Sequence, residues 1–329
     1  MPDLTYREAL RQALREEMQH DERVFVMGED VAAYGGSYAV TKGLVDEFGE
    51  KRLRDTPISE SAIVGASVGA AMAGLRPIAE LMTVNFALLA MDEIVNHAAK
   101  LHFMFGGQVN VPMVVRTAAG WGQLAATHSQ TFENYFAYVP GLLVVAPSTP
   151  RDAKGLLKAA IRDPNPVIFL EHSLLYGMKG EVPEGDFVEE LGKSKVIRQG
   201  SDVTIVSYSR MAVASMIAAE QLAKEGIEAE VIDLRSLRPI DMDPVIESVR
   251  RTNRAVVAEE GWRSCGMGAE IATRIYEKAF EYLDAPVARV AAPEVPLAYN
   301  RQLERDAVPD ELDVIEAVKR LVNHKEGGG

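Results

Sequence analysis

Apolar residues along the first half of the chain follow two alternating spacings. From Thr5 to His20 they recur at helical spacing, and Val24–Met27 then forms a short apolar run typical of a buried strand. The same alternation predicts helices near 60–73, 87–103, 131–138 and 150–162, and strands near 77–82, 112–117, 142–146 and 167–171. Short apolar strands that alternate with helices are typical of parallel βαβ units. The pattern therefore predicts a doubly wound α/β domain.

A second α/β series follows a break in the pattern. Between Ser173 and Gly200, glycine, proline and acidic residues replace the apolar runs and indicate a connector. Beyond it we expect strands at 203–207, 229–234, 255–259 and 287–290, and helices at 211–225, 243–251, 267–282 and from about 311. With 329 residues, the chain is long enough for two cores. We expect an α/β domain over 1–180, a linker over 181–200, a second α/β domain over 201–325 and a disordered Gly-Gly-Gly end.

Composition narrows the class of protein. The chain is 47% hydrophobic and 25% charged, and it has no apolar run of the roughly 18–20 residues that a membrane span needs. Its start lacks the basic and apolar regions of a secretory signal. A net charge of −13 argues against nucleic-acid binding, and a single cysteine, Cys265, fits a reducing compartment. We expect a soluble, cytoplasmic protein without membrane or nucleic-acid partners.

Candidate chemistry is expected beyond the carboxyl ends of the strands, where open parallel sheets bind ligands. Glu29 and Asp30 come directly after the first strand, and two adjacent carboxylates there either take part in acid–base chemistry or form a solvated turn. Ser59 is a candidate N-cap, and Glu60 falls in the first turn, where the helix dipole alone stabilises a carboxylate by about 0.3–1 kcal/mol.

The helix that Glu60 begins is unusually rich in small residues. Glycine and alanine recur through it at a density that helix propensity does not favour; they are Gly65, Ala66, Gly69, Ala70, Ala71, Ala73 and Gly74. Such a face permits the close approach of another helix or of a ligand. We therefore regard Glu60 as a stronger candidate than a capping carboxylate alone would be.

The third candidate is a histidine on a small-residue loop. The segment from Ala118 to Gln130 follows a predicted strand and carries His128, whose side chain titrates near neutral pH; a structural histidine is the alternative. Gly266–Ile271 resembles a dinucleotide fingerprint, but Ile271 replaces the third glycine. The sequence has no Walker motif, no Gly-x-Ser-x-Gly elbow and no zinc-type set of cysteines and histidines.

In this order and spacing, the segments resemble the β subunits of thiamine-diphosphate-dependent 2-oxoacid dehydrogenases, above all the decarboxylating first component of pyruvate dehydrogenase complexes. The resemblance runs from about Leu4 to the last helix. Its most specific stretches are Phe25–Val31, Asp55–Glu60, Ala71–Pro77, Asp152–Leu157, Ala160–Pro166 and Val231–Pro239. It implies two doubly wound domains, a transketolase-like pyrimidine-binding domain and a transketolase C-terminal-like domain. It also implies oxidative decarboxylation of pyruvate and reductive acetylation of a lipoyl group.

The resemblance also implies roles for particular residues. Glu60 matches the carboxyl that contacts ring nitrogen N1′ of the cofactor's aminopyrimidine, a charge-assisted bond of roughly 1.5–3 kcal/mol. Glu29 matches an acidic residue near the same ring that relatives use to relay protons. Phe86 matches an aromatic residue at the ring, and His128 matches the loop histidine placed near the substrate. A structural potassium ion is implied at positions that match Met113, Ala160, Ile161, Asp163 and Asn165.

One missing motif divides the site between two chains. Thiamine enzymes hold the diphosphate through magnesium, on a motif that starts with Gly-Asp-Gly and ends with Asn about 25–30 residues later; this sequence contains no Gly-Asp-Gly. Without a metal or a basic nest the phosphate charges stay uncompensated. The resemblance therefore implies an α subunit that supplies magnesium and the diphosphate half of the site in an α2β2 heterotetramer, and a dihydrolipoyl acyltransferase partner.

Other members of the family and one other class of protein stay open. Acetoin and branched-chain 2-oxoacid dehydrogenase β subunits share nearly all of these motifs. Three segments favour pyruvate as the substrate, namely Tyr208–Met211, Glu259–Trp262 and Pro296–Asn300. A non-catalytic scaffold subunit of a multienzyme complex is the alternative of another class, and the joint presence of Glu29, Glu60 and His128 speaks against it.

Overall fold

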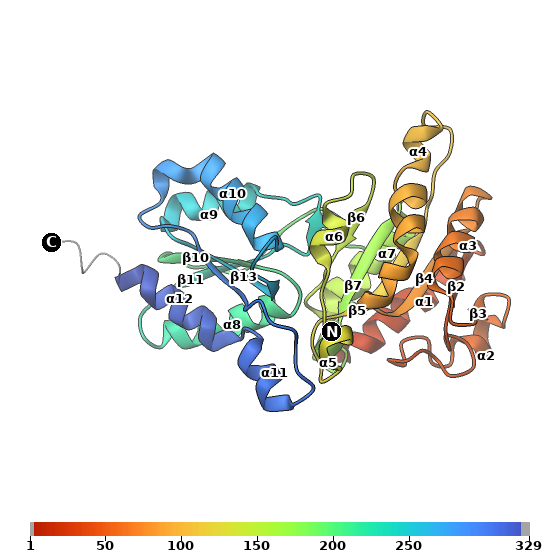
Figure 1. The fold of residues 1–329 in the computed structure, drawn as a ribbon, viewed down its shortest axis with the longest axis horizontal. Coiled ribbons are helices and arrows are strands. Elements are labelled where there is room, and N and C mark those ends of the chain that lie inside the picture. The colour runs from red at the N-terminus through yellow and green to blue at the C-terminus, as the bar shows by residue number, and fades with distance from the viewer. Residues whose placement is uncertain (1–2, 324–329) are drawn as a thin grey trace. The chain divides into compact units, whose positions relative to one another are not determined.

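The computed structural model describes residues 3–323, and the contacts within the chain divide it into two units (Figure 1). The first unit consists of the described residues up to Ala119 together with Tyr135–Leu191. The second consists of Gly120–Asn134 and the described residues from Gly192 onward. Gly120–Asn134 is thus inserted in the sequence of the first unit but packs with the second. The predicted Gly-Gly-Gly tail lies outside the described residues.

A parallel sheet organises the first unit. Its strands lie in the order β6-β7-β5-β4-β2-β3, and every pairing among them is parallel. They span Val24–Gly28 (β2), Leu53–Asp55 (β3), Arg76–Thr83 (β4), Val114–Ala119 (β5), Leu143–Val145 (β6) and Val167–His172 (β7). Two short strands, β1 (Asp3–Thr5) and β8 (Lys179–Glu181), form a separate antiparallel pair. The sheet confirms the α/β class that the apolar pattern predicts.

Two long helices of this unit begin directly after threonine residues that cap them. Thr5 caps α1 (Tyr6–His20) in a reciprocal capping box with Glu8. Thr149 caps α7 (Pro150–Arg162), whose first residue is proline. These two helices pack against each other. The unit also contains α2 (Leu44–Phe48), α3 (Glu60–Met72) and the short turn η3 (Ser173–Leu175).

The structure corrects the helix predicted over 87–103. This region consists of a 3-10 helix, η1 (Val84–Ala90), a π-helix, η2 (Glu93–Ala98), and a short α-helix, α4 (Leu101–Met104). Apolar spacing does not distinguish these helix types, because each keeps one face apolar over a few turns. The three-residue strands β1, β3 and β8 were also missed, since so few residues show no readable period.

The second unit is built on another sheet, in the order β14-β13-β10-β11-β9. All its pairings are parallel except that of the edge strand β9 with β11. The strands of this sheet span Lys195–Arg198 (β9), Val203–Ser207 (β10), Ala229–Asp233 (β11), Ala255–Trp262 (β13) and Ala288–Ala292 (β14). A short strand outside this sheet, β12, covers Ser236–Arg238. Strand β9 lies in the segment predicted as a connector. It was missed because it has only two apolar residues, between Lys195 and Arg198, and is only half buried at the edge of the sheet.

Helices cover both faces of this sheet. In Figure 1, α8 (Ser209–Ala223) and α12 (Glu311–Asn323) lie on one side of β10, β11 and β13, and α9 (Asp243–Thr252) and α10 (Met267–Ala279) lie on the other. Apolar residues of α8 and α12 form one buried cluster with the strands. The remaining elements of this unit are α5 (Ala125–His128), η4 (Phe280–Tyr282) and α11 (Arg301–Ala307), while α6 (Glu133–Ala137) begins in this unit and ends in the first. Both predicted domains are therefore doubly wound.

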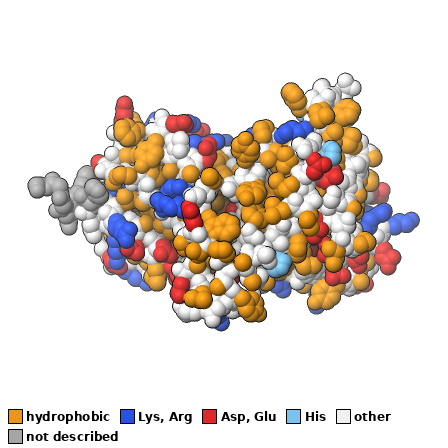
Figure 2. Space-filling model, in the orientation of Figure 1, with side chains coloured by type: hydrophobic (Ala, Val, Ile, Leu, Met, Phe, Trp, Pro, Cys, Tyr) orange, Lys and Arg blue, Asp and Glu red, His pale blue; other side chains and the backbone are white. Residues whose placement is uncertain are grey.

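Two surface properties bear on the partners. Among the described residues, no helix has both the length and the apolar character to cross a membrane. On the face shown in Figure 2, acidic and basic side chains are interspersed with apolar ones. The net charge of −13 is therefore not gathered into one acidic field on that face.

Candidate active site

Three candidate residues of the first unit follow three neighbouring strands. Glu29 comes directly after β2, Glu60 begins α3 after β3, and Phe86 lies in η1 after β4. The strands are adjacent and in register, since Gly28 pairs with both Asp55 and Glu80. Because the carboxyl ends of parallel strands meet at one edge of a sheet, the three candidates belong to the same edge.

Glu60 is a buried carboxyl at the start of a helix, with only 4% of its surface exposed. It is the first residue of α3, within the favourable field of the helix N-terminus. Ser59 occupies the predicted N-cap position, but its side chain makes no capping hydrogen bond. The hydroxyl cap expected at Ser59 is therefore wrong, and only the backbone continues the helix there, through Ile63 N–H and the Ser59 carbonyl at 2.9 Å.

Glu29 is electrostatically coupled to Glu60. The side chain is half-buried, and burial raises its pKa above the usual range of a glutamate, with the charges of Glu60 and Asp30 adding to the effect. The structure thus brings together, at the carboxyl edge of the sheet, the two acidic residues that the sequence selected.

Backbone contacts fix the segment that carries Glu29. Asp55, at the end of β3, accepts hydrogen bonds from Ala32 N–H (2.6 Å) and Ala33 N–H (3.2 Å). Thr56 N–H donates to the Gly28 carbonyl at 3.0 Å. A Cβ at Gly28 would lie 2.5 Å from the carbonyl oxygen of Glu80, so only glycine fits between β2 and β4. Sequence reasoning missed Asp55 as a positioning group, although its place at a strand end was a usable signal.

The segment that leads to Glu60 offers polar capacity for a ligand. Thr56 Oγ1 is buried and has no hydrogen-bond partner among the described residues. On the small-residue helix α3, a Cβ at Gly65 would lie 3.2 Å from the carboxyl carbon of Glu93 on η2. The predicted close approach therefore exists at Gly65. Both η1, which carries Phe86, and η2 pack on α3.

A buried ion network crosses the same sheet. Arg116 on β5 forms ion pairs with Glu80 on β4 and with Glu171 on β7. Tyr176 O–H donates to Glu171 at 2.7 Å. Burial raises the pKa of Glu171, although the Arg116 guanidinium opposes that shift. The apolar pattern did not reveal this network, because each charged residue stands alone within an otherwise apolar strand.

The carbonyls predicted to hold potassium lie elsewhere in the first unit. Met113 precedes β5, and Ala160–Asn165 joins the end of α7 to β7, so these residues belong to the amino ends of the strands. Arg76 Nη1 donates to the carbonyls of Ile161 (2.7 Å) and Asp163 (3.2 Å). Oxygen ligands suit a hard cation, and each carbonyl has a second lone pair. The residues present are compatible with a cation, away from Glu29 and Glu60.

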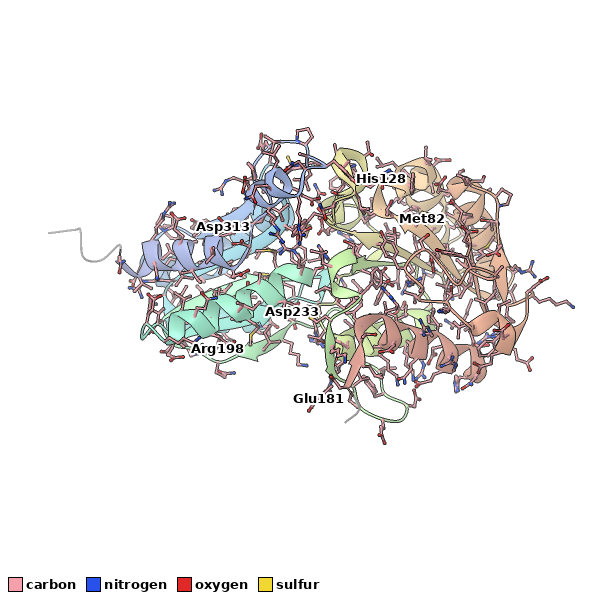
Figure 3. The ribbon with its side chains drawn as sticks, turned by 90° about the horizontal axis from the view of Figure 1, so that it is seen from below. Met82, His128, Glu181, Arg198, Asp233 and Asp313 are labelled. Atoms are coloured by element: carbon pink, nitrogen blue, oxygen red, sulfur yellow. The ribbon has the colours of Figure 1, made fainter. Side chains whose placement is uncertain are left out.

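His128 belongs to the second unit. It ends the short helix α5 and is half-buried (labelled in Figure 3). Its loop is fastened to other parts of that unit. Trp121 N–H donates to Glu260 at 3.0 Å, Gln123 N–H donates to Glu304 at 2.9 Å, and Ser129 O–H donates to Glu304 at 3.2 Å. Sequence reasoning missed Glu304, since more than a hundred residues separate it from the loop.

An acidic group of unusual proton affinity lies at the end of the same loop. Burial raises the pKa of Glu133 to about 7, and the charges of Glu260 and Glu259 add to the increase, while a hydrogen bond with Thr131 opposes it. A carboxyl with this pKa exchanges its proton near neutral pH. The effect was not visible in the sequence, because Glu133 and Glu260 are far apart in the chain.

The glycine pattern at Gly266 has a structural explanation. The carboxylate of Glu259 accepts a hydrogen bond from Gly268 N–H at 2.8 Å, at the start of α10. A Cβ at Gly268 would lie 2.4 Å from Glu259 Oε1, and one at Gly266 would lie 2.6 Å from Glu259 Oε2. The protein's own carboxylate therefore occupies the place where a nucleotide phosphate would bind. This agrees with the expectation that the motif does not bind a dinucleotide.

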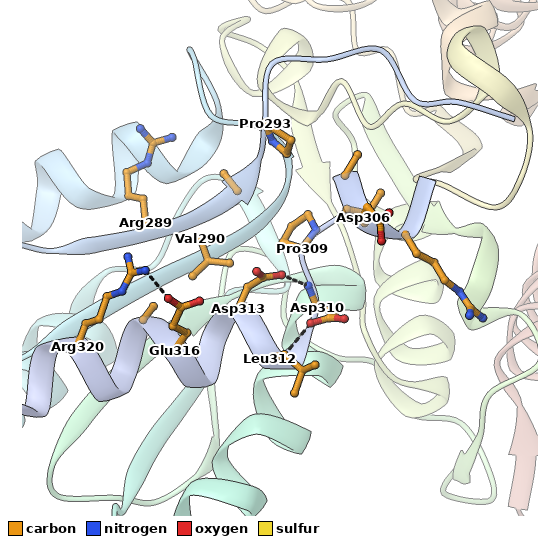
Figure 4. A pocket seen from close by; sticks show the side chains of 15 residues that line it. Arg289, Val290, Pro293, Asp306, Pro309, Asp310, Leu312, Asp313, Glu316 and Arg320 are labelled. Carbon is orange, nitrogen blue, oxygen red and sulfur yellow. Dashed lines mark hydrogen bonds and ion pairs between the residues drawn. The ribbon is translucent and has the colours of Figure 1, made fainter. Parts of the chain in front are cut away.

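A groove of about 440 Å³ in the second unit has no comparable chemistry (Figure 4). It lies along β14, α11 and α12, and several of its charged groups are paired. Glu316 pairs with Arg320, and Asp313 accepts from Asp310 N–H at 2.9 Å. The walls thus present charges of both signs, some of which are paired within the groove.

Comparisons with known proteins agree with this arrangement. A family model described as "Transketolase, pyrimidine binding domain" matches residues 3–179, and one described as "Transketolase, C-terminal domain" matches residues 192–314. The pyruvate dehydrogenase E1 component subunit beta of Rhizobium meliloti (strain 1021) is 52% identical over 98% of this chain and 70% of its own length. The protein of the same name from Rickettsia felis is 52% identical over 97% of this chain and 98% of its own length.

A solved structure has the same fold. It is that of a protein named "Split gene transketolase, inactive beta4 tetramer", and it superposes with a TM-score of 0.78 at 25% sequence identity, over 97% of this chain and 98% of its own. The correspondence over both units confirms the two-domain transketolase-like architecture that the resemblance implied.

Proposed function

Because the chain belongs to the family of pyruvate dehydrogenase E1 component β subunits, we propose that it contributes the aminopyrimidine half of a thiamine-diphosphate site. Together with an α subunit it decarboxylates pyruvate and transfers the acetyl group to a lipoyl group. The observation that carries the residue assignment is the buried carboxyl of Glu60 coupled to Glu29 at the carboxyl edge of the sheet.

In this proposal the residues of the chain bind and tune the cofactor. Thiamine diphosphate, when bound, supplies the carbon nucleophile and the electron sink for decarboxylation. Glu60 would hold a proton at ring nitrogen N1′, where a desolvated carboxyl forms a strong hydrogen bond. Glu29, with its raised pKa, would exchange protons with this pair. Phe86 would contact the pyrimidine ring, and His128 would move a proton at the substrate.

The partners follow from what the sequence lacks. Magnesium and the diphosphate are assigned to an α subunit, since the chain has no Gly-Asp-Gly motif. The related split-gene transketolase is, by its name, inactive as a tetramer of β chains, which supports this division of labour. We propose an α2β2 heterotetramer that acts on a dihydrolipoyl acyltransferase in the cytoplasm, where the exposed Cys265 stays a free thiol.

The experiment that tests this function is reconstitution with an α subunit that carries Gly-Asp-Gly. Turnover with an artificial electron acceptor is measured on pyruvate, acetoin and 3-methyl-2-oxobutanoate. We expect the highest kcat/KM on pyruvate, and activity only when the α subunit and thiamine diphosphate are both present. Preference for either other substrate would reassign the chain within its family. Absence of turnover on all three, with the assembled pair intact, would favour a scaffold role.

A further inference from the structure

The loop that carries His128, Gly120–Asn134, is strained and must be held in place. Three of its residues other than glycine, Gln123, Ala125 and Phe132, have left-handed backbone conformations, with φ of 59°, 64° and 55°. Such conformations cost of order 1 kcal/mol or more each, and they persist only where surrounding contacts over-determine them. The contacts that hold this loop therefore matter more than those of an ordinary surface loop.

Glu304 makes the central contacts. Both of its carboxyl oxygens accept from Gln123 N–H, at 2.9 and 3.0 Å, and Oε1 also accepts from Ser129 O–H at 3.2 Å. Ser129 Oγ in turn accepts from Leu124 N–H at 3.3 Å. One carboxyl group thus joins the residues just before and just after the turn Ala125–His128. The position of His128 depends on both ends of that turn.

The burial of Glu304 is otherwise hard to explain. It is fully buried, and it is the one buried residue of α11, a helix of seven residues. Burying a carboxyl costs free energy unless hydrogen bonds compensate it, and an apolar side chain would fill the same space at lower cost. The hydrogen bonds that Glu304 receives from Gln123 and Ser129 provide that compensation.

A second attachment holds the start of the loop. Glu260 accepts from Trp121 N–H at 3.0 Å and is ion-paired with Arg210. The guanidinium carbon of Arg210 lies 5.5 Å from the centre of the Trp121 ring. Arg210 also donates to the Pro309 carbonyl at 2.7 Å, two residues after α11. Glu260 thus fixes the base of the loop, and Glu304 remains the group that spans the turn with His128.

We propose that Glu304 is a positioning residue for the reaction, which sets the place of His128 by joining Gln123 N–H to Ser129 O–H. The inference rests on the proposed function, because it takes from it the role of His128. Replacing the carboxyl by an amide, in Glu304→Gln, sets an N–H₂ group against the Gln123 N–H in either orientation of the amide, because both carboxyl oxygens accept from that N–H. The loop then loses one attachment while the shape and volume of the side chain stay the same.

The attachment itself is tested without activity, by hydrogen exchange of the assembled enzyme. In Glu304→Gln we expect amide exchange in peptides covering 120–130 to rise by about 10-fold or more, since protection follows local opening. Peptides from α8 should be unchanged. Asp306→Asn, an exposed carboxyl on the same helix, serves as the matched control and should leave the loop at its wild-type rate. Wild-type protection of 120–130 in Glu304→Gln would overturn the proposal.

The positioning role is tested by a double-mutant cycle with His128→Ala. We expect Glu304→Gln to lower kcat on pyruvate by about 10- to 100-fold, the range of small misplacements, with KM changed less than about 3-fold. In the His128→Ala background it should have almost no further effect, because residues that act as a unit are not additive. Ser129→Ala removes a single hydroxyl and should show the same non-additivity with a smaller loss, even if Glu304→Gln does not assemble.

The outcomes separate the inference from the function on which it rests. If His128→Ala lowers turnover and the two losses multiply, Glu304 does not act through His128, and the inference fails alone. If His128→Ala turns over pyruvate at the wild-type rate, the role of His128 in the proposed function fails, and the positioning role of Glu304 fails with it.

Discussion

A carboxyl that is almost fully buried at the first turn of a helix, as Glu60 is, needs a partner that shares its proton or its charge. We expect Glu60→Gln in the enzyme assembled with its α subunit to lower kcat by ~10²–10⁴-fold, the usual effect of a positioned proton-transfer group. The measurement is steady-state turnover at saturating cofactor. Glu50→Gln, an exposed glutamate in the same unit, is the control and should retain wild-type turnover. Near-wild-type turnover of Glu60→Gln would remove Glu60 from the mechanism.

Glu133 makes the stability of the second unit depend on pH. Its pKa rises from 4.5 to about 7 on folding, so the folded chain keeps a proton that the unfolded chain releases between these values. The free energy of unfolding therefore falls as pH rises from about 4.5 to 7, by up to ~3 kcal/mol at 1.36 kcal/mol per unit. We expect Glu133→Gln to be stabilising relative to wild type above this range and not below it. Denaturant titrations on either side of the range check this, and an equal difference at both would contradict it.

The close packing of β2 against β4 at Gly28 determines the position of Glu29, the next residue in the chain. A Cβ at Gly28 would come within 2.5 Å of a backbone oxygen of β4, so Gly28→Ala must displace one of the strands. We expect a loss of about 1–3 kcal/mol in the free energy of unfolding and about 10-fold in kcat. Gly177→Ala, where nothing lies within 4 Å of the added methyl group, is the matched control. A stable, fully active Gly28→Ala would show that the strand junction tolerates movement.

The loop between α7 and β7 is the element for which a potassium ion is proposed. Arg76 occupies one acceptor position each on the Ile161 and Asp163 carbonyls, which leaves the second lone pairs of these oxygens for the ion. We expect the melting temperature of the assembled enzyme to be higher in potassium chloride than in choline chloride of equal ionic strength, by about 2–4 °C. Sodium chloride separates a selective site from a general salt effect. Identical melting temperatures in all three salts would remove the ion from the proposal.

Because the sequence contains no Gly-Asp-Gly motif for magnesium, we predict that the catalytic activity of the whole molecule depends on a second chain. Titration of this chain with its α subunit should produce activity that saturates at one α per β, since each site takes its diphosphate half from the other polypeptide. Turnover and mass by light scattering, measured along the same titration, check this. Appreciable pyruvate decarboxylation by the β chain alone would contradict the shared site.

The fold and one half of the candidate site were predictable because both rest on local signals. Runs of apolar residues predicted most of the parallel strands of both sheets. Glu29 was found because it follows the predicted strand Val24–Met27, and Glu60 because it begins a predicted helix. The helix types over 84–104 and the short strands β1, β3 and β8 were not predictable, because apolar spacing carries no information on hydrogen-bond register over so few residues. Glu304 and Glu260 were missed for a different reason, since their importance comes from contacts with a loop distant in sequence.

Gly120–Asn134 interrupts the sequence of the first unit, yet its attachments lie in the second. An amino-terminal fragment that ends near Leu191 would contain the loop with His128 but would lack Glu260 and Glu304, which hold that loop in place. The exchangeable modules of this protein are therefore not the two halves that its sequence order suggests. Exchanging the second half of the sequence between two relatives would replace Glu260 and Glu304 but would keep the original loop Gly120–Asn134.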